Sequence, residues 1–318
     1  MARRMTPLTR ILILTLISVS VFFCVVLSWV AGIHRTLLVT PAQLASLSYT
    51  TGDQQRYLEY ARTGQTIAPY KYRVIALAPV RLLVALGMNP YLAFLFWNAI
   101  SAIGASLLFA HLLGRFYEAT LLEQIAGMVA LLTSIGVVRT ALFPMLDCAA
   151  LLASVAVLYV IHDGRLRYFI PIALLAVGTK EVFAMSGLLF ALYQRRAYAV
   201  IALPIAAFML IRLALGGAAL EVNYGFDLAQ GHWPIYGQRL LSLRGWETVL
   251  IETLFAGGVL WAGVLAYRER FIRLALLTYV APMVAAAWIL SSRIARPLVV
   301  IVPVLALGCI LLIRQLEV

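Results

Sequence analysis

Long apolar runs separated by short polar segments dominate the chain. The first run, 11–33, has about the 17–25 residues that a helix needs to cross a bilayer. Because lipid offers no hydrogen-bond partners to the backbone, such runs predict an all-α bundle of membrane-spanning helices. We expect about ten spans, within a range of about 8 to 11. The predicted spans are 11–33, 90–113, 121–137, 143–161, 168–178, 182–193, 197–215, 247–266, 274–290 and 297–313.

Two stretches of the chain, 74–87 and 168–193, have an alternative interpretation. The stretch 74–87 is apolar but short, and it is predicted to lie along the membrane surface rather than to cross. Residues 168–193 are predicted to form two half-length helices that meet at the outer face. The alternative for this segment is one helix that buries Lys180 and Glu181 midway.

Composition supports a single integral-membrane domain over residues 1–318. The chain is 64% hydrophobic and 12% charged, which excludes an ordinary soluble domain. The run 11–33 exceeds the apolar core of a signal peptide, so it is interpreted as a retained first helix. Three cysteines fall inside apolar runs without CxxC spacing, and we expect them to pack as small hydrophobic residues.

The basic residues predict the orientation of the chain. The net charge of +12 comes from short clusters between apolar runs, a pattern typical of membrane topology and not of nucleic-acid binding. Lys and Arg are densest in alternate segments, which predicts a cytoplasmic N-terminus and C-terminus in a bacterial inner membrane. These inner segments are 1–10, 114–120, 162–167, 194–196, 267–273 and 314–318. The two long loops, 34–89 with short surface helices and 216–246, are then extracytoplasmic.

Asp53 is the main candidate for acid–base chemistry. It follows Gly52 and precedes a helix-compatible stretch, Gln54–Ala61. Because Asp is preferred immediately before the first turn of a helix, its carboxylate is interpreted either as a helix cap or as a general base for a substrate hydroxyl. Glu59 lies on roughly the opposite face of that helix, and we expect it to be solvated or salt-bridged.

A cationic cluster ends the first long loop. The sequence Tyr70-Lys-Tyr-Arg73 precedes an apolar stretch, and its members Tyr72 and Arg73 admit two interpretations. One is an interfacial anchor, in which tyrosine rings and a long cationic side chain sit at the headgroup level. The other is recognition of a phosphate, because a guanidinium presents a planar fork of donors to an oxyanion.

Charged residues at span ends are the second group of candidates. Asp147 lies in an otherwise apolar span, where a carboxylate usually faces a cavity or a cation, and Arg139 is its candidate partner. Lys180 and Glu181 close another apolar run, and they need separate partners because adjacent helical residues do not face each other. Each of these residues is interpreted either as part of a structural ion pair or as a substrate contact.

The last candidates lie in the C-terminal third. Arg293 and Arg296 are spaced to share a helix face, and their predicted outer location departs from the tendency of basic residues to stay inside. The loop 216–246 mixes aromatic, amide and acidic side chains, which suits either a sugar or lipid headgroups. The four histidines show no metal-binding spacing, so no metal site is predicted.

Several short motifs together resemble bacterial integral-membrane glycosyltransferases of the GT-C class. They are Gly52-Asp-Gln-Gln-Arg-Tyr57 and Pro69-Tyr-Lys-Tyr-Arg-Val74 in the first loop, Thr179-Lys-Glu181 after a middle helix, and Arg293-Ile-Ala-Arg-Pro297 before the last span. The resemblance covers most of the chain as a spacing of features.

The resemblance implies an inverting glycosyltransferase. Its donor would be a polyprenyl-phosphate-linked sugar, and its acceptor a glycan, lipid or protein at the extracytoplasmic face of the bilayer. Asp53 would activate the acceptor, while Arg73, Lys180, Arg293 and Arg296 would hold the lipid phosphate. Many relatives carry a second acid beside the first, but here Gln54 and Gln55 follow Asp53, so no metal or other cofactor is expected.

Two other functions stay open at this point. A transporter or flippase of a lipid-linked or anionic solute would typically show internal repeats and charged or broken helices near the membrane midplane. We find no clear duplication between the two halves of the chain. A non-catalytic assembly subunit would have no requirement for Asp53.

Overall fold

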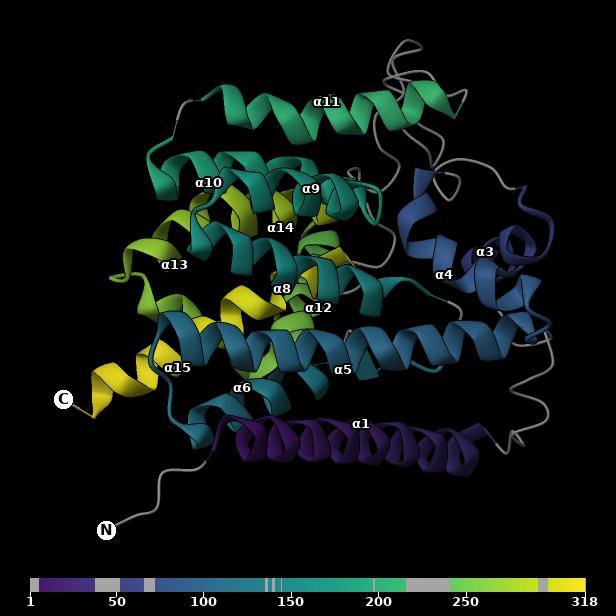
Figure 1. The fold of residues 1–318 in the computed structure, drawn as a ribbon, viewed down its shortest axis with the longest axis horizontal. Helices are drawn as coiled ribbons and strands as arrows, with labels where there is room; N and C mark the ends of the chain where they lie inside the picture. Colours follow the sequence, from purple (N-terminus) through teal and green to yellow (C-terminus); the bar gives the residue numbers. More distant parts are fainter. Residues whose placement is uncertain are drawn as a thin grey trace.

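The computed structural model describes residues 6–37, 52–65, 72–134, 137–138, 141–143, 145–196, 198–215, 241–290 and 297–317. These residues form helices and no strands (Figure 1). In the N-terminal half the elements are α1 (Pro7–Leu37), α3 (Gly52–Thr63), α4 (Val74–Ala85), α5 (Pro90–Phe116), α6 (Leu121–Leu132) and α8 (Asp147–Asp163). In the C-terminal half they are α9 (Leu166–Val177), η3 (Glu181–Met185), α10 (Ser186–Gln194), α11 (Ala199–Ala214), α12 (Leu243–Gly257), η6 (Gly258–Ala266), α13 (Arg270–Ala275), η7 (Leu276–Val280), α14 (Ala281–Leu290), η8 (Pro297–Ile301) and α15 (Val302–Leu316).

Among the described residues, four helical segments are long and apolar enough to cross a membrane. They are Pro7–Ser28, Pro90–Phe116, Leu243–Ala266 and Leu298–Leu316. Shorter apolar helices occupy most of the other predicted spans. An integral-membrane helical bundle is therefore supported, whereas the number of about ten spans stays a prediction.

Both segments with an alternative interpretation have helices of limited length. The helix α4 has 12 residues, so it is about 18 Å long, well short of a hydrocarbon core of about 30 Å. The helix is interrupted at residues 178–180, between α9 and η3. The prediction that 168–193 forms two separate helical pieces is therefore confirmed.

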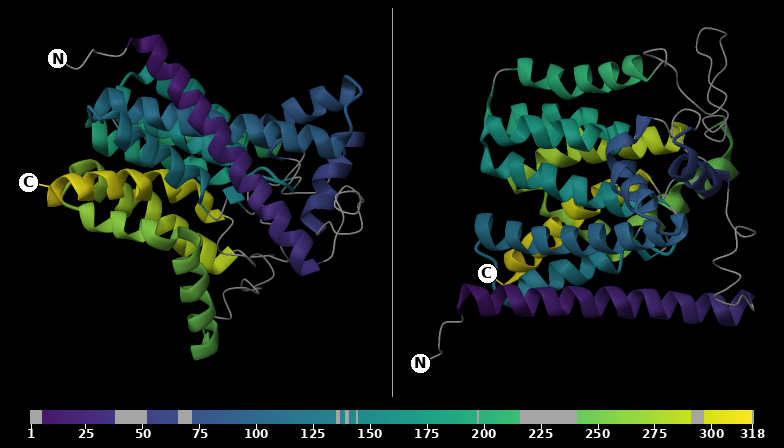
Figure 2. Two further views of the ribbon diagram at one scale, coloured as in Figure 1. Left: turned by 90° about the horizontal axis from the view of Figure 1, so that it is seen from below. Right: turned by 45° about the vertical axis from the view of Figure 1, so that its right-hand side comes forward.

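The most deeply buried long helix is α15, which packs against η6 and α8 at the centre of the bundle. Of its most apolar stretch 72% is buried, against 17% for α1. Close packing of α15 on η6 depends on two glycines: a Cβ on Gly263 would lie 2.1 Å from the Leu305 carbonyl oxygen, and one on Gly308 would lie 2.3 Å from the Gly263 carbonyl oxygen. The helix α1 lies along one edge with apolar side chains exposed, and α12 projects from the bundle (Figures 1 and 2).

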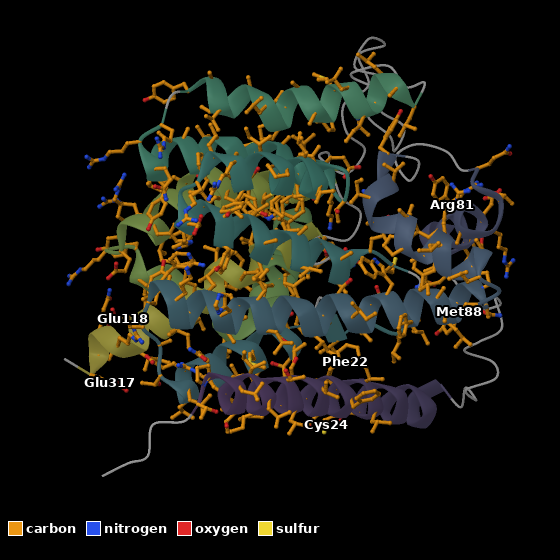
Figure 3. All side chains as sticks on the ribbon, viewed as in Figure 1. Phe22, Cys24, Arg81, Met88, Glu118 and Glu317 are labelled. Atoms are coloured by element: carbon orange, nitrogen blue, oxygen red, sulfur yellow. The ribbon has the colours of Figure 1, made fainter. Side chains whose placement is uncertain are left out.

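Polar contacts gather at the two opposite ends of the bundle. One end, called the Arg314 end, is where α1 begins and α15 ends (Figure 1). At this end arginines tie neighbouring segments together. These contacts are Arg10 to the Ala119 carbonyl at 3.1 Å, Arg115 to Asp163 at 3.0 Å, Arg270 to the Tyr193 carbonyl at 2.9 Å, and Arg314 to Glu123 and to the Tyr117 carbonyl. The opposite end, called the Arg73 end, carries α3 and α4. Figure 3 shows Glu118 and Glu317 at the first end, and Arg81 and Met88 at the second.

Most of the predicted inner segments therefore meet at the Arg314 end. The distribution of basic residues predicts that this end is cytoplasmic.

Candidate functional site

The first candidate side chain, Arg73, is positioned by the docking of α4 against the end of α9. The Ile75 backbone N–H donates to the Gly178 carbonyl at 3.1 Å. Gly178 permits this approach because a Cβ at that position would lie 2.4 Å from Ile75 Cγ1. Arg73, immediately before α4, is thereby brought beside residues 178–181, more than a hundred positions away in the sequence.

Arg73 joins three elements through its guanidinium. Its Nη2 donates to both carboxylate oxygens of Glu181, at 3.2 and 3.3 Å, and its Nη1 donates a hydrogen bond to the Tyr57 hydroxyl oxygen. Tyr57 is fully buried on α3, and its ring lies against Phe94 of α5. The side chains of Arg73 and Glu181 retain 14% and 21% exposure, so the pair is accessible from one side.

A second ion pair lies next to the first. Lys180 Nζ donates to Asp147 Oδ1 at 3.2 Å, and both side chains are buried. Asp147 lies in the first turn of α8, where the helix dipole favours a negative charge. The adjacent residues Lys180 and Glu181 thus take separate partners, as their spacing predicts. Asp147 is paired with Lys180, while its predicted partner Arg139 lies outside the described residues.

Polar contacts also hold the segment that leads into α8. Asn98 of α5 donates from Nδ2 to the Phe143 carbonyl at 2.9 Å, and the Tyr91 hydroxyl donates to the Leu142 carbonyl at 2.6 Å. Because these bonds anchor the backbone a few residues before Asp147, they orient its carboxylate toward α9.

Cations of both ion pairs favour the ionised form of Glu181. Glu181 lies at the break between α9 and η3, outside the four long helices. Burial alone raises the pKa of its carboxyl, but Arg73, the Glu181 backbone N–H and Lys180 outweigh burial and bring the pKa below its usual value. The Glu181 carboxylate is therefore ionised at neutral pH.

Arg212 is a third cation at this end, and the sequence did not suggest it. It lies in the last turn of α11 and is 6% exposed. Its guanidinium carbon lies over the rings of Tyr72 and Phe208, 4.9 and 4.5 Å from their centroids. Cation–π contacts of this kind hold a guanidinium by its faces. Since Tyr72 directly precedes Arg73, Arg212 belongs to the same neighbourhood.

We call this cluster the Arg73 site. Its members are Tyr57, Tyr72, Arg73, Asp147, Lys180, Glu181 and Arg212. Its described side chains include three cations, Arg73, Lys180 and Arg212. Cations gathered at one end of an apolar bundle are suited to binding an anion.

The remaining predicted residues are only partly described. Asp53 lies within the first turn of α3, whereas a capping residue would stand just before that turn. The backbone of Asp53 lies about one helical turn before Tyr57. Nothing is described of its side chain. Arg139, Arg293, Arg296 and most of the loop 216–246 lie outside the described residues. Glu59 forms an exposed pair with Arg56 at 3.2 Å, in agreement with its predicted minor role.

Sequence reasoning missed Tyr57 and Arg212 for different reasons. Tyr57 was one of several tyrosines in the loop, and nothing in the pattern distinguished it. Arg212 is the single charged residue in the 16 residues of α11, and an isolated charge in an apolar helix is the signal that could have identified it.

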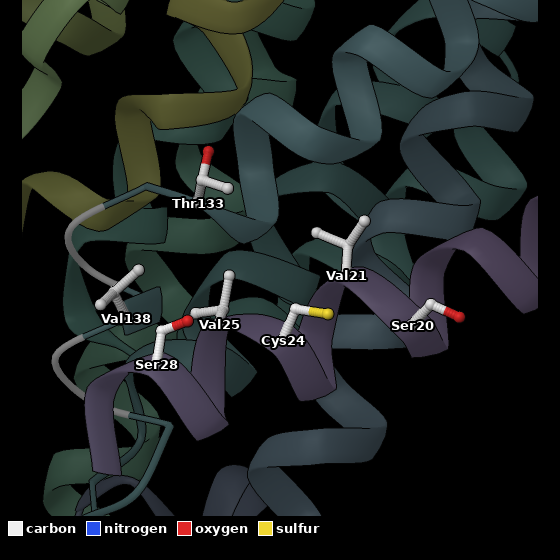
Figure 4. Close-up of a pocket in the computed structure, with 7 residues that line it drawn as sticks. All are labelled: Ser20, Val21, Cys24, Val25, Ser28, Thr133 and Val138. Atoms are coloured by element: carbon white, nitrogen blue, oxygen red, sulfur yellow. The ribbon is translucent and has the colours of Figure 1, made fainter. Parts of the chain in front are cut away.

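Two further observations concern metal ligands and a groove away from the Arg73 site. Among the described residues, no three His, Cys, Asp or Glu side chains come together as metal ligands. A separate groove of about 470 Å³ lies between α1 and the side chains of Thr133 and Val138 (Figure 4). Its lining is Ser20, Val21, Cys24, Val25, Ser28, Thr133 and Val138, without a charged side chain, so its chemistry differs from that of the Arg73 site.

Comparison of the chain with known protein families, curated proteins and solved structures found no match. The function is therefore argued from the Arg73 site and from the short motifs in the sequence.

Proposed function

We propose that the protein is a membrane glycosyltransferase that moves a sugar from a polyprenyl-phosphate donor to an acceptor hydroxyl, with inversion at the anomeric carbon. The observation that carries the proposal is the meeting of Arg73, Lys180 and Arg212 at one end of an apolar bundle. A lipid-linked donor requires such an arrangement, because its tail stays in the bilayer while its phosphate must reach cations at the surface.

In the proposed reaction, the acceptor oxygen attacks the anomeric carbon while the bond from that carbon to the phosphate oxygen breaks. The acceptor proton passes to the Asp53 carboxylate, and the electron pair of the broken bond remains on the leaving lipid phosphate. Negative charge thus grows on the phosphate oxygens, and cations held in place beforehand stabilise it most effectively. The Glu181 and Asp147 carboxylates keep Arg73 and Lys180 oriented for that role.

The proposal is tested with purified protein in lipid and a labelled polyprenyl-phosphate sugar, by following release of the label. We expect Asp53→Asn and Arg73→Gln to lower turnover by about a hundredfold or more, a typical loss for a general base or an oxyanion contact. The matched controls are Glu59→Gln and Arg56→Gln, which change the exposed pair on the same helix. Unchanged turnover in Asp53→Asn would remove that residue from the mechanism.

Transport of a lipid-linked or anionic solute is the second candidate. It is favoured by the helix interruption at residues 178–180 beside the buried Lys180–Asp147 pair, because transporters commonly build their sites from broken helices and charged residues. Proteoliposomes loaded with the labelled donor distinguish the two functions. Movement of intact donor between leaflets supports transport, whereas appearance of free polyprenyl phosphate supports sugar transfer.

A further inference from the structure

Two neighbouring turns at the Arg314 end carry four exposed arginines, and we call them the basic turn surface. One turn joins α8 to α9 and the other joins α10 to α11. The arginines are Arg165, Arg167, Arg195 and Arg196. Gln194 fixes the two turns together, because its Nε2 donates to the Ile161 carbonyl and a Cβ on Gly164 would lie 2.8 Å from its Oε1. The four cations therefore belong to one surface.

Cations exceed carboxylates on the basic turn surface. The Asp163 carboxylate accepts from Arg115 Nη2 at 3.0 Å and lies 3.6 Å from Arg165 Nε, so two arginines already share its charge. Glu269 is a further carboxylate nearby, and the cation of Arg270 follows it in the chain. Within the described part of the chain, the other three arginines of the surface contact no carboxylate. Their charge is therefore available to an external anion.

The backbone of Arg195 is in a conformation that favours glycine. Its φ is 52°, in the left-handed region at the end of α10, where helices commonly have glycine. The chain has glycine at the matching position of α8, where Gly164 has a φ of 71°. An arginine in this conformation lowers the stability of its turn, which indicates that its charge has a use beyond folding.

Tyrosines place the basic turn surface at the level of lipid headgroups. Tyr168 and Tyr198 are exposed beside the arginines, and tyrosine is typical of the boundary between bilayer and water. The guanidinium carbons of Arg167 and Arg165 lie 4.8 and 5.8 Å from the centroid of the Tyr168 ring. One ring thus holds two like charges close together, an arrangement that a shared anion stabilises.

We propose that the basic turn surface binds the phosphate headgroup of an anionic phospholipid. A guanidinium presents a planar fork of donors to phosphate oxygens, and arginines of both turns face the same headgroup. Basic surfaces between membrane helices recognise lipids of this class. The acyl chains then lie along α9 and α11, whose exposed apolar side chains include Leu166, Leu174, Leu175, Leu203 and Leu210. This site lies at the opposite end from the Arg73 site and does not depend on the proposed function.

The test measures lipid binding to the purified full chain in a neutral detergent. The protein is titrated with phosphatidylglycerol, with phosphatidylcholine and with glycerol phosphate, and bound molecules are counted by native mass spectrometry. We expect phosphatidylglycerol to bind at least about tenfold more tightly than phosphatidylcholine, because each arginine near an anionic lipid contributes a factor of about five. Glycerol phosphate, which lacks acyl chains, should bind more weakly than phosphatidylglycerol.

Arg195→Gly removes a cation without disturbing the turn, since glycine suits its φ. We expect this variant to lower phosphatidylglycerol affinity about fivefold and to keep or raise the Tm measured without lipid. Arg195→Gly combined with Arg167→Gln should lower the affinity about 25-fold. The matched control is Arg56→Gln, which removes an exposed arginine at the Arg73 end and should leave the affinity unchanged.

Three results would overturn the proposal: equal binding of the two phospholipids, wild-type affinity in the double variant, or the same loss in Arg56→Gln as in Arg195→Gly. Glycerol phosphate binding as tightly as phosphatidylglycerol would assign the surface to a free phosphate and overturn its assignment to a lipid. A decaglutamate peptide represents an acidic protein partner. Tighter binding of this peptide than of phosphatidylglycerol would likewise overturn the lipid assignment.

Discussion

At the scale of single residues, Arg73 is the centre of the site because its guanidinium contacts two elements at once. Glu181 accepts from one of its nitrogens and the Tyr57 hydroxyl accepts from another. A hydrogen bond to a charged group contributes about 1.5–3 kcal/mol, more than one between neutral partners. Tyr57 therefore matters for the direction of Arg73 as well as for packing on α3.

Tyr57→Phe isolates that hydrogen bond, because the ring and its contact with Phe94 are kept. We expect the free energy of unfolding to fall by about 1–2 kcal/mol and phosphate binding to weaken, since Arg73 loses a hydrogen bond that fixes its direction. Denaturant titration and farnesyl phosphate titration measure the two effects. Tyr168→Phe, which removes a hydroxyl from an exposed ring, is the control; equal effects of the two variants would contradict the role of Tyr57.

The Lys180–Asp147 pair supports a second prediction at this scale. Lys180→Met removes the cation that lies 3.2 Å from the buried Asp147 carboxylate, and breaking a buried ion pair in this way typically costs about 3–5 kcal/mol. The double variant Lys180→Met with Asp147→Leu should recover most of this loss, because no isolated charge stays buried. A double-mutant cycle on the free energy of unfolding measures the coupling. Additive effects would show that the two side chains do not interact.

At the scale of elements, close backbone contacts decide how the helices pack. In the core of the bundle, η6 and α15 come into close contact at Gly263 and Gly308. At the Arg73 site, the start of α4 contacts the end of α9 at Gly178. Small residues are typical of helix contacts in membranes, where attraction depends on close packing and not on exclusion of water. Close contact at glycines therefore determines both the packing of the core and the position of Arg73.

Gly308→Ala tests the contact in the core. Its new methyl group would lie 2.3 Å from the Gly263 carbonyl oxygen, so the two helices must separate, and we expect a loss of about 1–3 kcal/mol in unfolding free energy. Gly104→Ala is the matched control, because its Cβ would meet Leu152 at an ordinary 3.7 Å. That change should be neutral or slightly stabilising, as alanine favours a helix over glycine. Similar losses in both variants would rule out the close approach as the cause.

At the scale of the whole molecule, the two polar ends have different characters. Arginines at the Arg314 end bind backbone carbonyls as well as carboxylates and so tie segments together, whereas the described contacts of Arg73, Lys180 and Arg212 at the other end are with carboxylates, a tyrosine hydroxyl and aromatic rings. The first pattern is typical of cytoplasmic anchors, and the second is typical of a binding site. We therefore propose that the bundle separates anchoring from ligand binding along its long axis.

Cysteine labelling tests this separation across the membrane. In a background with Cys24, Cys148 and Cys309 replaced, we introduce Arg165→Cys at the Arg314 end and Glu59→Cys at the Arg73 end. We expect a membrane-impermeant maleimide to label position 59 from outside in intact cells and position 165 only after permeabilisation, because basic clusters stay on the cytoplasmic side. Labelling of both positions from the same side would contradict the two-ended arrangement.

Much of the architecture follows from the sequence because the bilayer restricts what an apolar chain can form. Runs such as 90–113 and 297–313 had to be helices, since lipid leaves the backbone no other partners. The break at residues 178–180 was also predictable, because two charged residues interrupt an apolar run there. Charge and spacing further identified Tyr72, Arg73, Asp147, Lys180 and Glu181, which the structure brings together.

Only the tertiary structure decided which of these residues meet. The partners of Arg73 and Asp147 come from elements distant in the sequence, and their pairing depends on how α4 docks on Gly178 and how α8 packs beside α9. The inclusion of Arg212 depends on the path of α11 past Tyr72, which no local pattern encodes. Hydrophobic spacing depends on local chain chemistry and so can be read from one sequence, whereas ion pairing depends on long-range packing, which only the folded chain reveals.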